Sequence, residues 1–104
     1  MSTRRILREF RRELDLLYGR RLKSVILYGS WARKRATAES DIDVLIVLEG
    51  DVRPGQEIDR MIDIITDLNL KHDVLLSVYP VSERTYATIN SPLLLNVRRE
   101  GVPI

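Results

Sequence analysis

Apolar side chains recur at steps of three and four along the start of the chain. They stand at Ile6, Leu7, Phe10, Leu14, Leu17 and Tyr18. This spacing puts one apolar stripe on a helix, so it predicts an amphipathic helix over residues 3–18. Ser2 or Thr3 is suited to cap its first turn, and Gly19 is suited to end it.

The opposite face of this helix is basic. Its arginines are Arg4, Arg5, Arg8, Arg11 and Arg12. A nucleic-acid-binding stripe is one interpretation, but such surfaces usually carry aromatic side chains on which bases stack, and none is interleaved here. A solvent-exposed or partner-binding face is the preferred interpretation, and nucleic acid remains an unfavoured alternative.

Three later segments are typical of buried β-strands. Residues 24–29 (SVILYG) form a β-branched and aliphatic run that ends at glycine. Residues 41–50 (DIDVLIVLEG) predict a second strand, and residues 44–48 lack alternation, which indicates that both of its faces are covered. Residues 72–79 (HDVLLSVY) predict a third strand, which Pro80 is expected to end.

Helical patterns separate and follow these strands. Residues 31–36 (WARKRA) are compatible with a short helix. After a turn at residues 54–55, the apolar spacing of residues 58–68 predicts a second amphipathic helix, whose aspartates face solvent. Two further helices are predicted over residues 82–89 and 91–101, each beginning at a serine suited to cap it. The fold class is therefore α/β (α+β), with a short mixed sheet of about three strands packed with helices.

Composition supports one small globular domain over residues 1–104, with 44% hydrophobic and 31% charged residues. The chain has no cysteine, which excludes disulfides, thiolate metal sites and thiol nucleophiles. It has neither an apolar run of the roughly 20 residues that a membrane span needs nor a signal-peptide pattern. We therefore expect a cytoplasmic protein without a membrane partner.

Charge is distributed unevenly along the chain. Residues 1–40 hold 11 Lys/Arg against 4 Asp/Glu, whereas residues 41–80 hold 3 against 9. Two solvated faces would explain this pattern. A site where basic groups receive phosphate and carboxylates receive metal ions would explain it as well.

Two aspartates separated by one residue begin the second predicted strand. Successive side chains on a strand point to opposite faces, so Asp41 and Asp43 share one face and their carboxylates converge. The two charges repel each other, and a divalent cation removes that conflict. Ligands that offer only oxygen favour Mg²⁺ or Mn²⁺ over Zn²⁺.

The Gly29-Ser30 pair ends the first strand and is suited to phosphate. Glycine lets an anion approach the backbone, and the N-terminus of a helix beginning at Ser30 would offer free N–H groups. Arg33 adds positive charge nearby. Asp73 begins the third predicted strand and is the candidate for a third carboxylate, with His72 as an alternative base.

The stretch GSWARKRATAESDID (residues 29–43) resembles the Gly-Ser, ten residues, Asp-x-Asp signature of the minimal nucleotidyltransferases, in the superfamily typified by DNA polymerase β. Ten residues separate Ser30 from Asp41, as in that signature. Arg33 and Ser40 also match its usual form. The resemblance covers nearly the whole chain, including its last predicted helix.

The resemblance implies ATP as a substrate and two Mg²⁺ ions, with Mn²⁺ as a possible substitute. It also implies that the acceptor hydroxyl attacks the α-phosphate and that pyrophosphate leaves. The expected site residues are Asp41, Asp43 and Asp73 as catalytic groups and metal ligands, and Gly29, Ser30, Arg33 and Ser40 as nucleotide-binding groups.

Chains of this size look like the MNT half of two-gene HEPN–MNT toxin–antitoxin modules. In such modules an MntA-like antitoxin transfers AMP from ATP to a tyrosine of its partner, a helical HEPN-family RNase toxin. The resemblance therefore implies protein adenylylation of a HEPN partner, together with complex formation. Two alternatives remain open: a non-catalytic antitoxin that neutralises its partner by binding, and nucleotidyl transfer to RNA or a small molecule.

Overall fold

The structure is a computed structural model that describes residues 2–37 and 40–104. Residues 38–39 belong to the Gly-Ser to Asp-x-Asp spacing and lie outside the described part. In chain order the elements are α1 (Thr3–Tyr18), the 3₁₀ turn η1 (Gly19–Arg21), β1 (Leu22–Tyr28), β2 (Ile42–Leu48), α2 (Pro54–His72), β3 (Leu76–Ser82), α3 (Glu83–Thr88), α4 (Pro92–Glu100) and β4 (Val102–Pro103).

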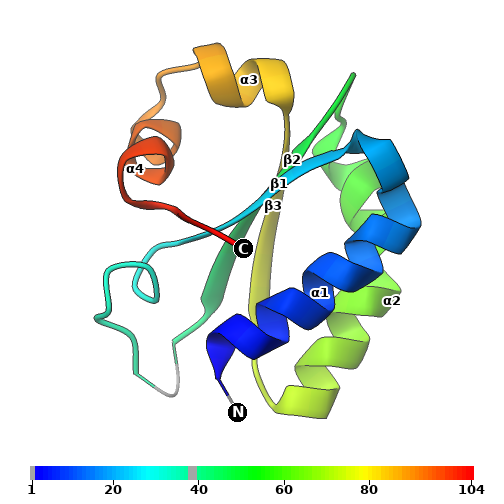
Figure 1. Ribbon diagram of the computed structural model, residues 1–104, viewed down its shortest axis with the longest axis vertical. Coiled ribbons are helices and arrows are strands. Elements are labelled where there is room, and N and C mark those ends of the chain that lie inside the picture. Colours follow the sequence, from blue (N-terminus) through cyan, green and yellow to red (C-terminus); the bar gives the residue numbers. More distant parts are fainter. Residues whose placement is uncertain (1, 38–39) are drawn as a thin grey trace.

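The strands form one mixed sheet in the order β3-β2-β1-β4. β1 and β2 are antiparallel, as are β1 and β4, whereas β2 and β3 are parallel. α2 makes the crossover that a parallel pair requires. Figure 1 shows α1 and α2 together on one side of the sheet and α3 and α4 on the other. This confirms the small α+β architecture, with a fourth strand added at the C-terminus.

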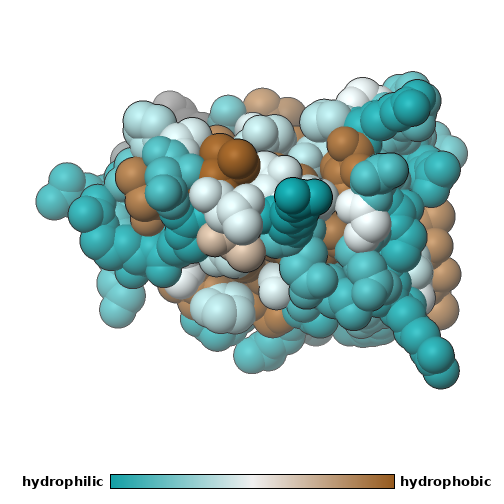
Figure 2. Space-filling model, turned by 90° about the horizontal axis from the view of Figure 1, so that it is seen from above, coloured by the Kyte–Doolittle hydropathy of each residue, from teal (hydrophilic) through white to brown (hydrophobic). Residues whose placement is uncertain are grey.

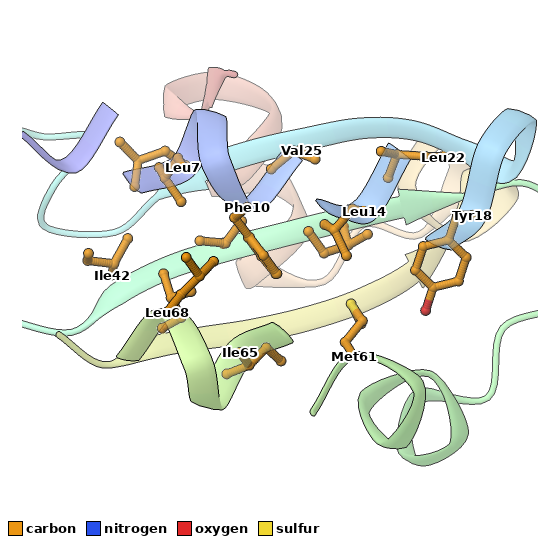
Figure 3. Packing of buried hydrophobic residues seen from close by; sticks show 14 of the residues in the cluster. Leu7, Phe10, Leu14, Tyr18, Leu22, Val25, Ile42, Met61, Ile65 and Leu68 are labelled. Atoms are coloured by element: carbon orange, nitrogen blue, oxygen red, sulfur yellow. The ribbon is translucent and has the colours of Figure 1, made fainter. Parts of the chain in front are cut away.

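The larger core lies between the sheet and the helices α1 and α2. The apolar stripe of α1 is buried as its spacing predicted except at Leu17, which is 42% exposed, and Ser2 caps that helix by accepting a hydrogen bond from the Arg5 N–H. Figure 3 shows Phe10 and Leu14 directed towards the strands, with Met61 and Ile65 of α2 completing the layer. Burying side chains of this size contributes about 1.5–3 kcal/mol each, so this layer holds most of the fold together.

A smaller core joins the other face of the sheet to α4. It comprises Ile26, Leu45, Val47, Val81, Leu94 and Val97. Because strand side chains alternate, this is also the face to which Asp43 belongs, two residues before Leu45. α4 therefore covers the same sheet face that carries Asp43 of the sequence signature.

The third strand differs from its expected range. We expected it over residues 72–79 and ended by Pro80, but β3 runs from Leu76 to Ser82 with Pro80 inside it. β3 is an edge strand of the sheet, where the missing N–H of a proline can face away from the neighbouring strand. Its start is delayed because α2 continues to His72.

Hydrophilic side chains cover most of the face seen in Figure 2, and apolar atoms appear between them in separate small areas. Within residues 2–37 and 40–104, no helix combines the length and the apolar character that crossing a membrane would need.

Candidate active site

Gly29 follows β1 and turns the chain with a left-handed backbone, at a φ of +73°. Residues with a side chain rarely adopt this conformation. A Cβ at this position would overlap the Oδ2 atom of Asp43 and would stand 3.2 Å from its Cγ. Gly29 is therefore required both by the turn and by the carboxylate that packs against it.

The aspartate pair stands at the start of β2, next to this turn. Asp43 is half-buried and pairs with Tyr28 of β1, whereas Asp41 is exposed just before the strand. Burial raises the pKa of Asp43 above its ordinary value, the charge of Asp41 raises it further, and the Arg33 guanidinium lowers it. The two carboxylates are thus close enough to repel each other, and the site favours a neutralising cation.

A pocket of about 270 Å³ opens beside the pair. β1 and the turn after it contribute Tyr28, Gly29 and Arg33, and Asp43 lies at its wall. The remaining lining comes from one face of α4, namely Leu93, Asn96, Val97 and Glu100. In Figure 1 the turn after β1 and the start of β2 lie at the lower end of the sheet, below α4.

Arg33 brings a positive charge to this pocket. Its Nη1 atom lies 3.7 Å from the Oε2 of Glu100, so an ion pair links the turn to the end of α4. Both side chains keep more than a third of their surface exposed. The guanidinium therefore has solvent on one side and can exchange its partner for a ligand anion.

The expected short helix over residues 31–36 does not form. The backbone makes a turn instead, in which the Arg33 N–H donates to the Gly29 carbonyl at 3.1 Å and the Arg35 N–H donates to the Ser30 carbonyl at 2.9 Å. Lys34 has a φ of +58°, which a continuing right-handed helix cannot accommodate. Ser30 consequently lies in a tight turn rather than at the N-terminus of a helix.

Ser40 fixes the chain just before the aspartate pair. Its Oγ accepts a hydrogen bond from the Thr37 N–H at 2.9 Å, and its carbonyl accepts one from the Trp31 indole at 3.3 Å. Trp31 also packs against the larger core. Ser40 therefore links Thr37 to Trp31, which packs against the core, and its expected role in nucleotide binding stays a prediction.

Asp73 is not at the start of a strand, and this expectation was wrong. It forms the C-cap of α2 in the left-handed conformation, at φ 51° and ψ 50°, with its N–H donating to the Asn69 carbonyl. Asparagine and aspartate tolerate this conformation better than other residues with a side chain. Among the described residues, no three acidic, histidine or cysteine side chains are grouped to hold a metal ion. The structure thus brings Asp41 and Asp43 together and leaves Asp73 apart.

His72, the alternative base, contacts Glu9 of α1. It ends α2 with its side chain only 3% exposed, and its Nε2 lies 3.1 Å from the Oε2 of Glu9 on α1. Lys71 contacts the same carboxylate at 2.6 Å. These two contacts hold α2 against α1, which is a structural role.

The glycine turn, Asp43 and Arg33 line one pocket, with Asp41 beside it, and comparison with known proteins shows to which family such a pocket belongs. A family model described as a nucleotidyltransferase domain matches residues 5–100. The chain belongs to the nucleotidyltransferase family. The predicted resemblance to this superfamily is confirmed, and the protein is a transferase.

This nucleotidyltransferase is similar along almost its whole length to two proteins of Methanocaldococcus jannaschii. One, named "Putative protein adenylyltransferase MJ0604", is 40% identical over 102 residues, which cover 97% of this chain and 96% of that protein. The other, named "Putative protein adenylyltransferase MJ0141", is 32% identical over 99 residues, which cover 95% of each chain.

The residues of the pocket fit a divalent cation. The donors are carboxylate oxygens, and burial, followed by the charge of Asp41, raises the pKa of Asp43, whereas the Arg33 guanidinium lowers it. Asp41 and Asp43 would hold the ion at the start of β2, with Gly29 leaving room for the second carboxylate. Such an ion supplies charge neutralisation for the phosphates and the leaving group of a nucleotidyl transfer.

Sequence reasoning missed the contribution of α4 to the nucleotidyltransferase pocket. Its lining residues recur at steps of three, one and three, which is one helical face. That spacing indicates that this face of α4 points inward, but it does not indicate which part of the sheet the face packs against. Tyr28 lies between the smaller core and the pocket, and burial followed by the charge of Asp43 raises its pKa.

Proposed function

We propose that this nucleotidyltransferase transfers AMP from ATP to a tyrosine hydroxyl of a partner protein in a Mg²⁺-dependent reaction. The observation that carries the proposal is the meeting of Gly29, Arg33 and Asp43 in one pocket, with Asp41 beside it. Similarity to two proteins named as protein adenylyltransferases supports a protein as the acceptor.

The proposed reaction assigns each part of the pocket a role. Glycine at position 29 lets the phosphate tail approach the backbone of the turn, the Arg33 guanidinium binds that tail, and Asp41 and Asp43 would hold the cation that accompanies it. The acceptor hydroxyl releases its proton to water, and its oxygen forms a bond to the α-phosphorus. The bond from that phosphorus to the bridging oxygen breaks, and pyrophosphate leaves with the electron pair.

The acceptor that we propose is a HEPN-family RNase toxin, and adenylylation of this partner would make the chain an antitoxin. The resemblance to HEPN–MNT modules supports this choice. α1 offers one surface for the partner, because Arg4, Arg5, Arg8 and Arg12 are exposed or nearly so along its outer side. A basic surface suits an acidic region of a partner protein.

The test is a labelling reaction with ATP labelled on the α-phosphate, Mg²⁺ and a HEPN protein encoded beside this chain. Asp41→Asn and Asp43→Asn should each lower labelling of the partner by at least about a hundredfold, because they remove charge from the reacting centre. Asp73→Asn is the matched control, with the same change outside the carboxylate pair, and should keep most of the labelling.

Two other results would replace this proposal. Inhibition of the partner that survives both Asp41→Asn and Asp43→Asn, without any label, would show a binding antitoxin. The separation of Asp73 from the pair is the observation that favours this second candidate. Label on RNA or on a small molecule instead of the protein would show a different acceptor.

A further inference from the structure

We propose that Ser77 occupies the third position of the cation site, beside Asp43, and that its neutral hydroxyl keeps the affinity of the free protein for divalent ions low. The inference rests on the proposed metal-dependent function, because it concerns the same carboxylate pair. It assigns a role to a residue that neither the sequence signature nor the family match identifies.

The register of the sheet places Ser77 next to Asp43. β2 and β3 are parallel, and the pairs run from Ile42 with Leu76 through Asp43 with Ser77. Paired residues on neighbouring strands point to the same face and lie about 5 Å apart. Ser77 is exposed, so its side chain is open to solvent.

This position is the one that Asp73 was expected to fill. A carboxylate can join the pair from β3 only at a residue whose side chain shares the face of Asp43. Asp73 lies in the C-cap of α2, three residues before β3 begins. Leu76 points to the opposite face and belongs to the larger core. Ser77 is therefore the first residue of β3 directed towards the aspartate pair.

A serine at this position changes how a cation binds. Two carboxylates balance the charge of one divalent ion, whereas its remaining coordination positions need further oxygen atoms. A neutral hydroxyl is a weaker donor than a carboxylate for such an ion, because affinity rises with the number of charged ligands. The phosphates of a nucleotide can supply the missing oxygens, so we infer that the ion enters mainly together with ATP.

The test measures Mn²⁺ binding by the protein without nucleotide, through the paramagnetic resonance signal of the free ion. Ser77→Asp should tighten Mn²⁺ binding at least about tenfold, because it adds a third charged ligand. Ser82→Asp is the matched control. It makes the same substitution at the other end of β3, at the N-cap of α3, where aspartate caps as well as serine. This control should leave Mn²⁺ binding unchanged.

A second variant is needed because Ser77→Asp places three carboxylates together and could misfold. The exchange Asp43→Ser with Ser77→Asp keeps the number of carboxylates at two. It should bind Mn²⁺ more tightly than Asp43→Ser alone, because the carboxylate has only moved across one strand pair. Equal affinities in both comparisons would overturn the assignment of Ser77.

These outcomes are separable from those of the proposed function. Tight Mn²⁺ binding by Ser77→Asp with no labelled acceptor would support the role of Ser77 and contradict adenylyl transfer. A labelled partner with no gain in Mn²⁺ affinity would support adenylyl transfer and contradict the role of Ser77.

Discussion

Replacing Gly29 by alanine should destabilise the protein and distort the carboxylate of Asp43 at the same time. The substitution has two costs, which the structure separates. The first is the left-handed backbone at φ +73°, which disfavours any residue with a Cβ by about 1–2 kcal/mol. The second is the overlap of the new Cβ with the Asp43 Oδ2 atom, which forces that side chain out of its position.

Gly50 isolates the first cost. Its φ of +83° imposes a similar strain, but nothing lies within 4 Å of the position that a Cβ would take. Gly50→Ala should therefore lower the free energy of unfolding by about 1–2 kcal/mol. Gly29→Ala should exceed that loss by about 1 kcal/mol, the usual cost of an off-rotamer side chain. Urea denaturation followed by circular dichroism measures both values.

The contribution of the clash can be tested by removing its other partner. Asp43→Ala deletes the carboxylate and leaves only the Asp43 Cβ, 3.4 Å from the new methyl group, which is ordinary contact. In that background Gly29→Ala should cost no more than Gly50→Ala. If the extra loss persists without the carboxylate, or if the two glycine variants are equally stable in the native background, the steric link between Gly29 and Asp43 is wrong.

Three further outcomes follow from the charged groups. Glu57 is 4% exposed and accepts a hydrogen bond from the Tyr18 hydroxyl at 3.0 Å, so Tyr18→Phe should cost about 1 kcal/mol in urea denaturation. Asp43 has a raised pKa in the folded protein, so the stabilisation from its protonated carboxyl is present at low pH and is lost as the pH rises from 3.8 through the pKa of the folded state. Without metal, Asp43→Asn should therefore raise the melting temperature at pH 7. Glu100→Gln should tighten ATP binding about two- to fivefold in calorimetry, because it frees Arg33 from an exposed ion pair worth at most about 1 kcal/mol.

The parts of the fold that the sequence predicted well are those with a local signal. The apolar stripe of α1, the serine caps at Ser2, Ser82 and Ser91, and the run of residues 44–48 all depend on neighbours in the sequence. The Gly29 turn belongs to this group too, since a glycine between a strand and a polar segment marks a tight turn.

The errors arose where a boundary depends on packing or on one backbone conformation. The apolar stripe of α2 ends at Leu68, but the helix continues to His72 because Glu9 of α1 binds its last turn. Lys34 takes a left-handed conformation that nothing in its side chain requires, and the short helix after Gly29 is lost. Neither effect has a signature in a single sequence.

The pocket also depends on contacts that are distant in sequence. Arg33 and Glu100 meet because α4 packs across the sheet face that carries Asp43, an arrangement set by the smaller core. Spacing within α4 identifies an inward face, but it cannot identify the strand end that this face meets. The glycine turn and the aspartate pair could therefore be predicted, whereas the opposite wall of the pocket could not.

The position of the aspartate pair explains how the fold tolerates it. Asp43 carries a raised pKa, so its ionised form opposes folding at neutral pH. It is followed in the same strand by residues 44–48, each at most 2% exposed. Burial of five such side chains contributes several kcal/mol, even after a reduction for the apolar surface that the unfolded chain already buries. This contribution exceeds the repulsion between two partly solvated carboxylates. Placing Asp43 at the start of this buried strand therefore fixes its position, where a bound cation would neutralise the pair.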